Sequence, residues 1–198
     1  MISDGGGLIS ACELVLGRSL RQRCLIHKSR NVTSKVSRHD LEAVKKEFWE
    51  IFDTTELGIP PGQRLVETVQ RRIDAFAARW EKTYPAAVKT LLTDRGSLTA
   101  YLRFPLEHHK RIRHSNFIER TFGETRRVKV IGRFPGETSC VSLAFAVLSR
   151  AATGWRGFTT TPAGLRQLER MRRDLFHPTD AEVIHLAPPA RVSLTKAA

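Results

Sequence analysis

The chain has 198 residues, of which 41% are hydrophobic and 27% are charged, a balance that is typical of a globular domain or part of one and excludes a disordered chain. Its apolar runs are short and interrupted and its start lacks the pattern of a secretory signal, so we expect a cytoplasmic protein that does not enter the membrane. Lysine and arginine outnumber aspartate and glutamate by 33 to 20, a formal net charge of +13, which favours nucleic acid as a partner over a merely basic surface.

The N-terminal residues predict short elements of both kinds. Residues 2–4 are expected to end a strand, and the three glycines at 5–7 to make a turn. A short helix is predicted over 8–16, and Gly17 should end it. Residues 20–32 are predicted to form a second strand, although two adjacent apolar residues weaken the alternation that a strand requires.

The middle of the chain predicts helices packed through apolar stripes. Asp40 is a plausible N-cap for the first, and Pro60-Pro61 opens the second, which Pro85 should end. Shorter helices are expected through Leu91 and Leu102. The two long stripes, at three-and-four spacing, consist of Leu41, Val44, Phe48, Ile51 and Phe52, then of Leu65, Val69, Ile73, Phe76 and Trp80. Among these residues, Phe48, Phe76 and Trp80 are the strongest candidates for the core.

Three further helices are predicted toward the C-terminus. They span about Ser115–Arg127, the apolar-periodic residues 141–151, and Leu165–Leu175. From His177 onward proline and small residues dominate, which favours a poorly ordered tail. Cys12 and Cys140 fall in apolar helical patterns and are predicted to be small buried thiols.

Positive charge is concentrated in two segments of the chain. Residues 18–38 hold seven basic and no acidic side chains, and residues 108–133 hold eight basic against two acidic ones. The stretch 39–105 between them has ten of each sign. Such a distribution is expected if the two basic segments line a common groove that binds phosphates.

Two acidic residues stand out by their context. Asp4 is expected at the end of a strand and is followed by glycines that let another chain approach. Glu119 lies in a predicted helix among many arginines, and Asn116, Glu119 and Gly123 share one of its faces. A carboxylate on an open polar face can hold Mg²⁺, although spacing alone favours a salt-bridged surface glutamate.

Several short motifs, in order, resemble those of a known family. Ser3-Asp4-Gly5 and the stretch Arg21–Asn31, in which Cys24 and His27 form a Cys-x-x-His motif, are similar to the signature around the second catalytic aspartate of Mutator-type transposases of bacterial insertion sequences. Asn116-Phe-Ile-Glu119-Arg120 resembles that family's Asn-x-x-Glu-Arg motif, which carries its last catalytic acid. Val130–Pro135, a helix and Trp155 continue the resemblance.

The resemblance implies an α/β chain, mostly helical, with an incomplete RNase H-like core and an all-α insertion. Residues 1–38 would be a remnant of the catalytic core, 39–107 the helical insertion, 108–176 the C-terminal helices of the core, and 177–198 the tail. It implies a DNA transposase that cleaves phosphodiester bonds and transfers strands, with Asp4 and Glu119 as catalytic residues and as ligands of Mg²⁺ or Mn²⁺. Implied partners are the terminal repeats of the element, target DNA and, in the full-length family, further copies of the chain at the nucleoid.

The family's first catalytic aspartate has no counterpart in this sequence. It lies well upstream of the second in the family, whereas Met1 precedes Asp4 by only three residues. Two carboxylates alone should hold a pair of metal ions poorly. We therefore expect a truncated or decayed transposase that is inactive by itself.

The remaining candidates are DNA contacts and a motif of uncertain role. Arg120 and Arg126 are the favoured phosphate contacts, with pairing to Glu124 or solvent as the alternative. Cys24 and His27 could join His108, His109 or His114 in a zinc site, which would make the chain a zinc-stabilised DNA-binding module without catalysis. Alternatively His27 orients the active-site strand or contacts a phosphate. The expected DNA-binding residues are Arg111, Arg113, Asn116, Arg120, Arg126 and Arg127.

Overall fold

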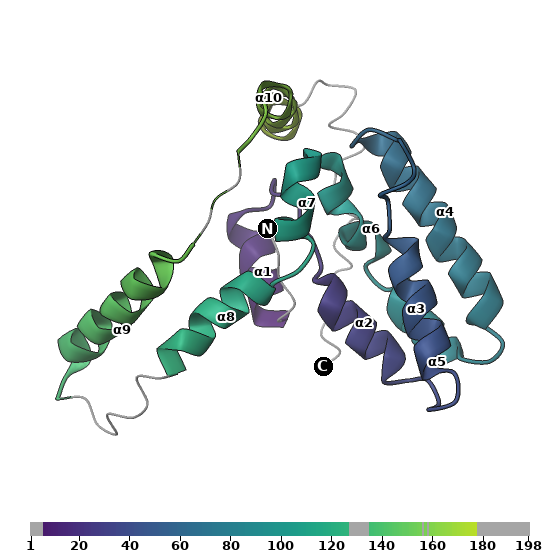
Figure 1. Ribbon diagram of the computed structural model, residues 1–198, viewed down its shortest axis with the longest axis horizontal. Coiled ribbons are helices and arrows are strands. Elements are labelled where there is room, and N and C mark those ends of the chain that lie inside the picture. The colour runs from purple at the N-terminus through teal and green to yellow at the C-terminus, as the bar shows by residue number, and fades with distance from the viewer. Residues whose placement is uncertain (1–5, 127–134, 156, 158, 178–198) are drawn as a thin grey trace, which may run out of the picture.

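The computed structural model describes residues 6–126, 135–155, 157 and 159–177. This part of the chain is mostly helical, as predicted, and no strand is assigned within it, so an α/β arrangement is not seen there. None of its helices is long and apolar enough to cross a membrane. The elements in chain order (Figure 1) are α1 Gly6–Val15, α2 Leu25–Thr33, α3 Leu41–Ile51, α4 Gln63–Trp80, α5 Pro85–Leu92, α6 Arg95–Leu98, the 3-10 helix η1 Ala100–Arg103, α7 Leu106–Ile112, α8 Asn116–Thr125, α9 Glu137–Ala152 and α10 Pro162–Phe176.

The prediction of a strand over residues 20–32 is wrong. The segment begins extended, where the Arg23 N–H donates to the Ser97 carbonyl at 2.8 Å, but it becomes helix α2 from Leu25 onward. Leu25, Lys28 and Val32 are buried at helical spacing, so the pattern of burial here is that of a helix and not that of a strand. The strand end predicted at residues 2–4 lies outside the described residues.

Gln22 supports the extended segment before α2 through its side chain. Its amide nitrogen donates to the Leu98 carbonyl at 3.2 Å, and its amide oxygen accepts from the Tyr101 N–H at 2.9 Å. The side chain is buried, so it satisfies backbone groups that no water reaches. One glutamine thereby joins the chain before α2 to the end of α6 and to η1.

Helices α2 to α5 and η1 surround one hydrophobic core. Phe48 is fully buried and Phe76 is 4% exposed, which confirms both as core residues. Trp80 packs partly buried against this core, and its indole N–H donates to Glu47 at 2.8 Å. Burial of each large apolar side chain contributes about 1.5–3 kcal/mol, so this cluster supplies most of the stabilisation in the described chain.

Helix α2 contributes to this hydrophobic core, although residues 1–38 were predicted to belong to a different domain from residues 39–107. Leu25 and Val32 pack with the apolar residues of α3 to α5. Lys28 is 3% exposed, and its ammonium donates to the carbonyls of Thr90 at 2.8 Å and Thr93 at 2.7 Å, at the C-terminal end of α5. Residues on both sides of position 38 therefore share one core, and the predicted division into domains stays a prediction.

Two helix boundaries differ from the sequence expectation. The second long helix ends at Trp80, and Pro85 begins α5 instead of ending its predecessor, because a proline suits the first turn, where its missing N–H has no partner to lose. Asp40 precedes α3 as expected, but its carboxylate accepts from the Tyr84 hydroxyl and makes no capping hydrogen bond.

Helices α8 and α9 lie side by side, away from the core formed by α2 to α5 (Figure 1). Both were predicted, and α9 has the expected periodicity, yet no residue of α9 is buried. Phe145 is 71% exposed, and Cys140 is exposed, so the predicted burial of that thiol is wrong, whereas Cys12 is buried as expected. The reason is that α9 packs chiefly along α8, which leaves most of its surface uncovered.

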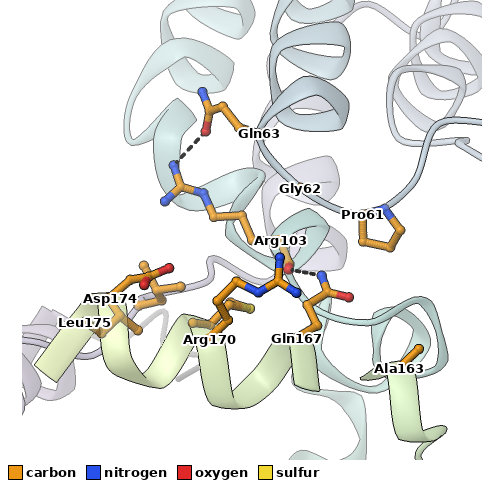
Figure 2. A pocket seen from close by; sticks show the side chains of 11 residues that line it. Pro61, Gly62, Gln63, Arg103, Ala163, Gln167, Arg170, Asp174 and Leu175 are labelled. Carbon is orange, nitrogen blue, oxygen red and sulfur yellow. Dashed lines mark hydrogen bonds between the residues drawn. The ribbon is translucent and has the colours of Figure 1, made fainter. Parts of the chain in front are cut away.

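Helix α10 is joined to the remainder of the fold by polar contacts. The Gln167 side chain donates to the Arg103 carbonyl at 2.7 Å, and the Arg103 guanidinium donates to Gln63 at 3.3 Å (Figure 2). Before α10, the Thr161 N–H donates to Glu107 at 3.1 Å. Gly164 makes room for this carboxylate, because a Cβ there would lie 2.5 Å from it. The predicted tail lies outside the described residues from 178 onward.

A candidate site at Cys24, His27 and Glu119

The structure brings the Cys-x-x-His motif and Glu119 together. One thiol, one imidazole nitrogen and one carboxylate oxygen of Cys24, His27 and Glu119 all lie within 4.8 Å of one another. His27 Nε2 is 3.3 Å from Glu119 Oε1. The sequence singled out all three residues but gave no reason to expect that they touch.

The first turn of α2 positions Cys24 and His27. Cys24 immediately precedes the helix and His27 follows three residues later, so both side chains lie on one side of that turn. The Cys24 thiol is buried and accepts from the Ser115 N–H at 3.4 Å. The Leu25 N–H donates to the Arg113 carbonyl at 3.0 Å. These contacts attach the start of α2 to the segment that links α7 to α8.

Glu119 lies in the first turn of α8, where the helix dipole favours a negative charge. Its carboxylate accepts from the Ser115 hydroxyl, and its N–H donates to the Ser115 carbonyl at 3.0 Å. The side chain is 45% exposed. The carboxylate is thus held between Ser115 and His27 while one side stays open to solvent.

The histidines that the sequence offered as zinc ligands do not join this group. His109 donates from Nε2 to the Phe104 carbonyl at 2.9 Å and packs edge-on against Tyr101, and burial lowers its pKa. Burial, together with Arg113, also lowers the pKa of His114, whose buried Nδ1 has no hydrogen-bond partner among the described residues. The third possible donor beside Cys24 and His27 is therefore Glu119 and not a histidine.

The donor set decides which metal the group fits. Mg²⁺ and Mn²⁺ prefer oxygen ligands, which only Glu119 and Ser115 supply here. A thiol, an imidazole and a carboxylate suit Zn²⁺ better, although three donors leave one tetrahedral position open. A magnesium ion thus fits at Glu119 but not at Cys24. The predicted partner Asp4 lies outside the described residues, so the pairing of Asp4 with Glu119 stays a prediction.

Three of the predicted DNA contacts line one cleft. Arg111, Asn116 and Arg120 form part of a cleft of about 1100 Å³ between α7 and α8 on one side and α9 on the other. Arg113 lies outside it and is partly buried, Arg126 is exposed at the end of α8, and Arg127 is not among the described residues. Arg150 and Trp155 also line it and were not predicted, whereas Lys110 belongs to the basic segment 108–133 that was expected to line a groove.

The first of the two basic segments does not contribute to this cleft, and a groove common to both segments stays a prediction. No residue of segment 18–38 lines the cleft. Arg21 and Arg23, whose side chains are 19% and 14% exposed, lie 3.6 and 4.0 Å from the Asp94 carboxylate, and Lys28 is buried. Much of the first segment's charge therefore has a structural role, which net charge alone could not reveal.

A cleft lined by arginine and lysine side chains attracts anions such as the phosphates of nucleic acid. The sequence matches the family described as "Transposase, Mutator family" over residues 1–157. The chain belongs to this family.

Curated relatives are similar over most of this chain. The transposase for insertion sequence element IST2 of Acidithiobacillus ferrooxidans is 26% identical over 189 residues, which cover 91% of this chain and 61% of the relative. The transposase of IS6120 of Mycolicibacterium smegmatis is 27% identical over 157 residues, which cover 78% of this chain and 46% of the relative. The transposase of IS905 of Lactococcus lactis is 32% identical over 139 residues, with 69% and 33% covered. The chain thus spans between a third and three fifths of these relatives' lengths.

Proposed function

We propose that this chain is part of a DNA transposase that cleaves and joins phosphodiester bonds at an insertion sequence, with Glu119 as one of its catalytic acids. The observation that carries the proposal is the meeting of Glu119 with Cys24 and His27, which are far apart in sequence, next to a cationic cleft. Family membership supports the same reading, since the relatives are transposases for insertion sequence elements.

The residues around Glu119 have separable tasks. His27 and the Ser115 hydroxyl hold the carboxylate in one orientation. A Mg²⁺ or Mn²⁺ ion bound at Glu119 would activate the attacking hydroxyl and stabilise the leaving oxygen. Lys110, Arg111 and Arg120, on the wall of the cleft, attract the DNA phosphates and fix the strand beside the acid.

The family resemblance supports an assignment of the helices to the parts of a full-length transposase. In this proposal α2, α8 and α9 belong to an RNase H-like core, α3 to α6 and η1 belong to a helical insertion, and the full-length protein acts as a homo-oligomer on DNA at the nucleoid. Among the described residues Glu119 is the one carboxylate in the Cys24–His27 group. Two-metal chemistry needs more carboxylates than this, and we propose Asp4 as a second catalytic acid.

The test uses Mn²⁺ binding to the full chain, followed by electron paramagnetic resonance of the free ion. Glu119→Gln should weaken binding at least about tenfold, because it removes a direct ligand. Glu124→Gln, which removes the same charge from the same helix, is the matched control and should bind like the wild type. Equal Mn²⁺ affinity of the Glu119→Gln variant and the wild type would overturn the assignment of Glu119.

A second candidate function is a zinc-stabilised DNA-binding module without catalysis. The buried thiol of Cys24 beside the His27 imidazole favours it, because these are donors that Zn²⁺ prefers. Protein purified without chelators would then hold one equivalent of zinc, and Cys24→Ser would lose both the metal and thermal stability. Zinc-free protein with unchanged melting after chelator treatment would exclude this alternative and leave the transposase proposal in place.

A further inference from the structure

The cleft beside α8 has two chemically different walls. Lys110 and Arg111 at the end of α7 and Arg120 on α8 give one wall positive charge. The α9 wall carries Val147, Ala151, Gly154 and Trp155, with Arg150 at its edge. The lining of the cleft thus contains four lysine or arginine side chains and one carboxylate, that of Glu124. Such a cleft suits a ligand that is anionic on one side and flat and apolar on the other.

Trp155 is the feature that distinguishes this cleft from a plain phosphate groove. It follows the end of α9. The backbone N–H of Trp155 donates to the Ala152 carbonyl at 2.9 Å, and this bond fixes the turn that carries the indole. The residue is 48% exposed although tryptophan is among the most apolar side chains. Its neighbours on this wall, Ala151 and Gly154, are small, and the indole is part of the cleft lining.

We propose that this cleft binds a single nucleotide of the DNA strand whose base has left the duplex stack. The base would stack on Trp155 while Arg111, Arg120 and Arg150 contact the flanking phosphates. Base–aromatic stacking tolerates any sequence and is a common source of affinity for unpaired strands. Intact duplex exposes phosphates but covers the base faces, so it would leave the indole unused. The inference rests on the proposed function, because it takes DNA as the ligand.

The position of α8 relates this nucleotide to the candidate acid. Asn116 and Arg120 are four residues apart and share the helix face that lines the cleft. Glu119 lies on the neighbouring face, toward His27. An unpaired nucleotide in the cleft would therefore be held next to the acid, and the strand would be fixed at the point where it leaves the duplex.

The experiment compares two DNA ligands on the full chain in the presence of EDTA, so that no metal chemistry enters. One is a duplex with a single unpaired thymidine beyond its end, and the other carries an abasic sugar at that position. Fluorescence anisotropy should show the thymidine ligand binding about 5- to 100-fold more tightly. Trp155→Leu should abolish this preference, and Trp155→Phe should retain most of it while losing the quenching of indole fluorescence.

Two further variants separate stacking from charge and from folding. Arg150→Gln should weaken both ligands alike, because it removes a phosphate contact. Phe145→Leu removes another exposed aromatic ring of α9 that does not line the cleft, and it should change neither affinity. Circular dichroism melting of each variant verifies that α9 is folded.

The outcomes distinguish this inference from the proposed function. Equal affinity of the wild type for both ligands, or a preference that survives in Trp155→Leu, overturns the stacking site and leaves Glu119 and the transposase proposal untouched. Failure of the wild type to bind any DNA at low salt overturns both. A preference lost only in Trp155→Leu supports the site.

Discussion

Replacing Lys28 by methionine tests how α2 is fixed to the fold. Lys28 is buried, and its ammonium donates to two carbonyls, those of Thr90 and Thr93, where α5 ends. A cation at the C-terminal end of a helix also interacts favourably with the helix dipole. Methionine keeps the apolar stem in place but removes both hydrogen bonds and leaves the two carbonyls with less compensation.

The magnitude follows from these two contacts. Each hydrogen bond of a charged group contributes about 1.5–3 kcal/mol net, so the pair would contribute about 3–6 kcal/mol. Methionine offsets part of this loss of stability, because the desolvation cost of burying the lysine charge is removed as well. We expect Lys28→Met to lower the free energy of unfolding by about 2–4 kcal/mol, a large share of the 5–15 kcal/mol that is typical of a domain.

The measurement is urea unfolding of the full chain followed by far-ultraviolet circular dichroism at pH 7. Lys35→Met is the matched control, because Lys35 is exposed just past the end of α2, and its replacement should change stability by less than about 0.5 kcal/mol. The loss at Lys28 should persist in 1 M salt, unlike that of a surface ion pair. A Lys28→Met variant as stable as the Lys35→Met control would refute this account of the α2–α5 contact.

Three other perturbations probe separate parts of the fold. Gly164→Ala should displace the Glu107 carboxylate and so break its hydrogen bonds with Thr161, which precedes α10; limited proteolysis before α10 should then be about fivefold faster. Gly157→Ala, which meets nothing within 4 Å, is the control, and equal rates for the two variants would contradict the prediction. Gln22→Leu should lower stability by about 2–4 kcal/mol, because it leaves buried backbone groups of two segments without partners; an unchanged melting temperature would count against it. Burial lowers the pKa of His109 below its ordinary 6.5, so the folded state binds this proton more weakly than the unfolded state does. Its contribution is complete above pH 6.5 and declines as the pH falls below that value; urea unfolding at pH 7.5 and 5.5 should show a smaller difference for His109→Gln than for the wild type, and an identical difference would exclude this cause.

The helices of the middle segment could be predicted because their apolar residues follow one face. The stripe through Phe48 and the stripe through Phe76 correspond to α3 and α4, since each buries that face against the same core. The apolar pattern did not predict helix α2, because a lysine interrupts the buried face of that helix. Lys28 is buried there because two carbonyls receive its charge, a compensation that depends on the tertiary structure and leaves no trace in the spacing.

Burial on α9 could not be predicted for a related reason. Periodicity shows that one face of a helix is apolar, but it does not show whether anything covers that face. Phe145 and Cys140 have the periodicity of core residues and are exposed, because α9 packs chiefly along α8.

The candidate site was only partly predictable. The motifs identified Glu119, Cys24 and His27 separately, but their contact depends on backbone hydrogen bonds between the start of α2 and the α7–α8 link. Arg150 on α9 and Trp155 just after that helix were missed as lining residues because both lie outside the basic segment that contains Glu119.

These contacts link the hydrophobic core to Glu119 through helix α2. Lys28 attaches α2 to α5, and the adjacent His27 contacts Glu119 from the same helix. A shift of α2 would therefore move His27 away from the carboxylate while Ser115, on the α8 side, stayed in place. The helices between the two motifs therefore fix the position of α2, whose start is hydrogen-bonded to the α7–α8 link. Mn²⁺ affinity should then fall in Lys28→Met although Lys28 touches no ligand, and an unchanged affinity in a destabilised variant would show that Ser115 alone suffices to orient Glu119.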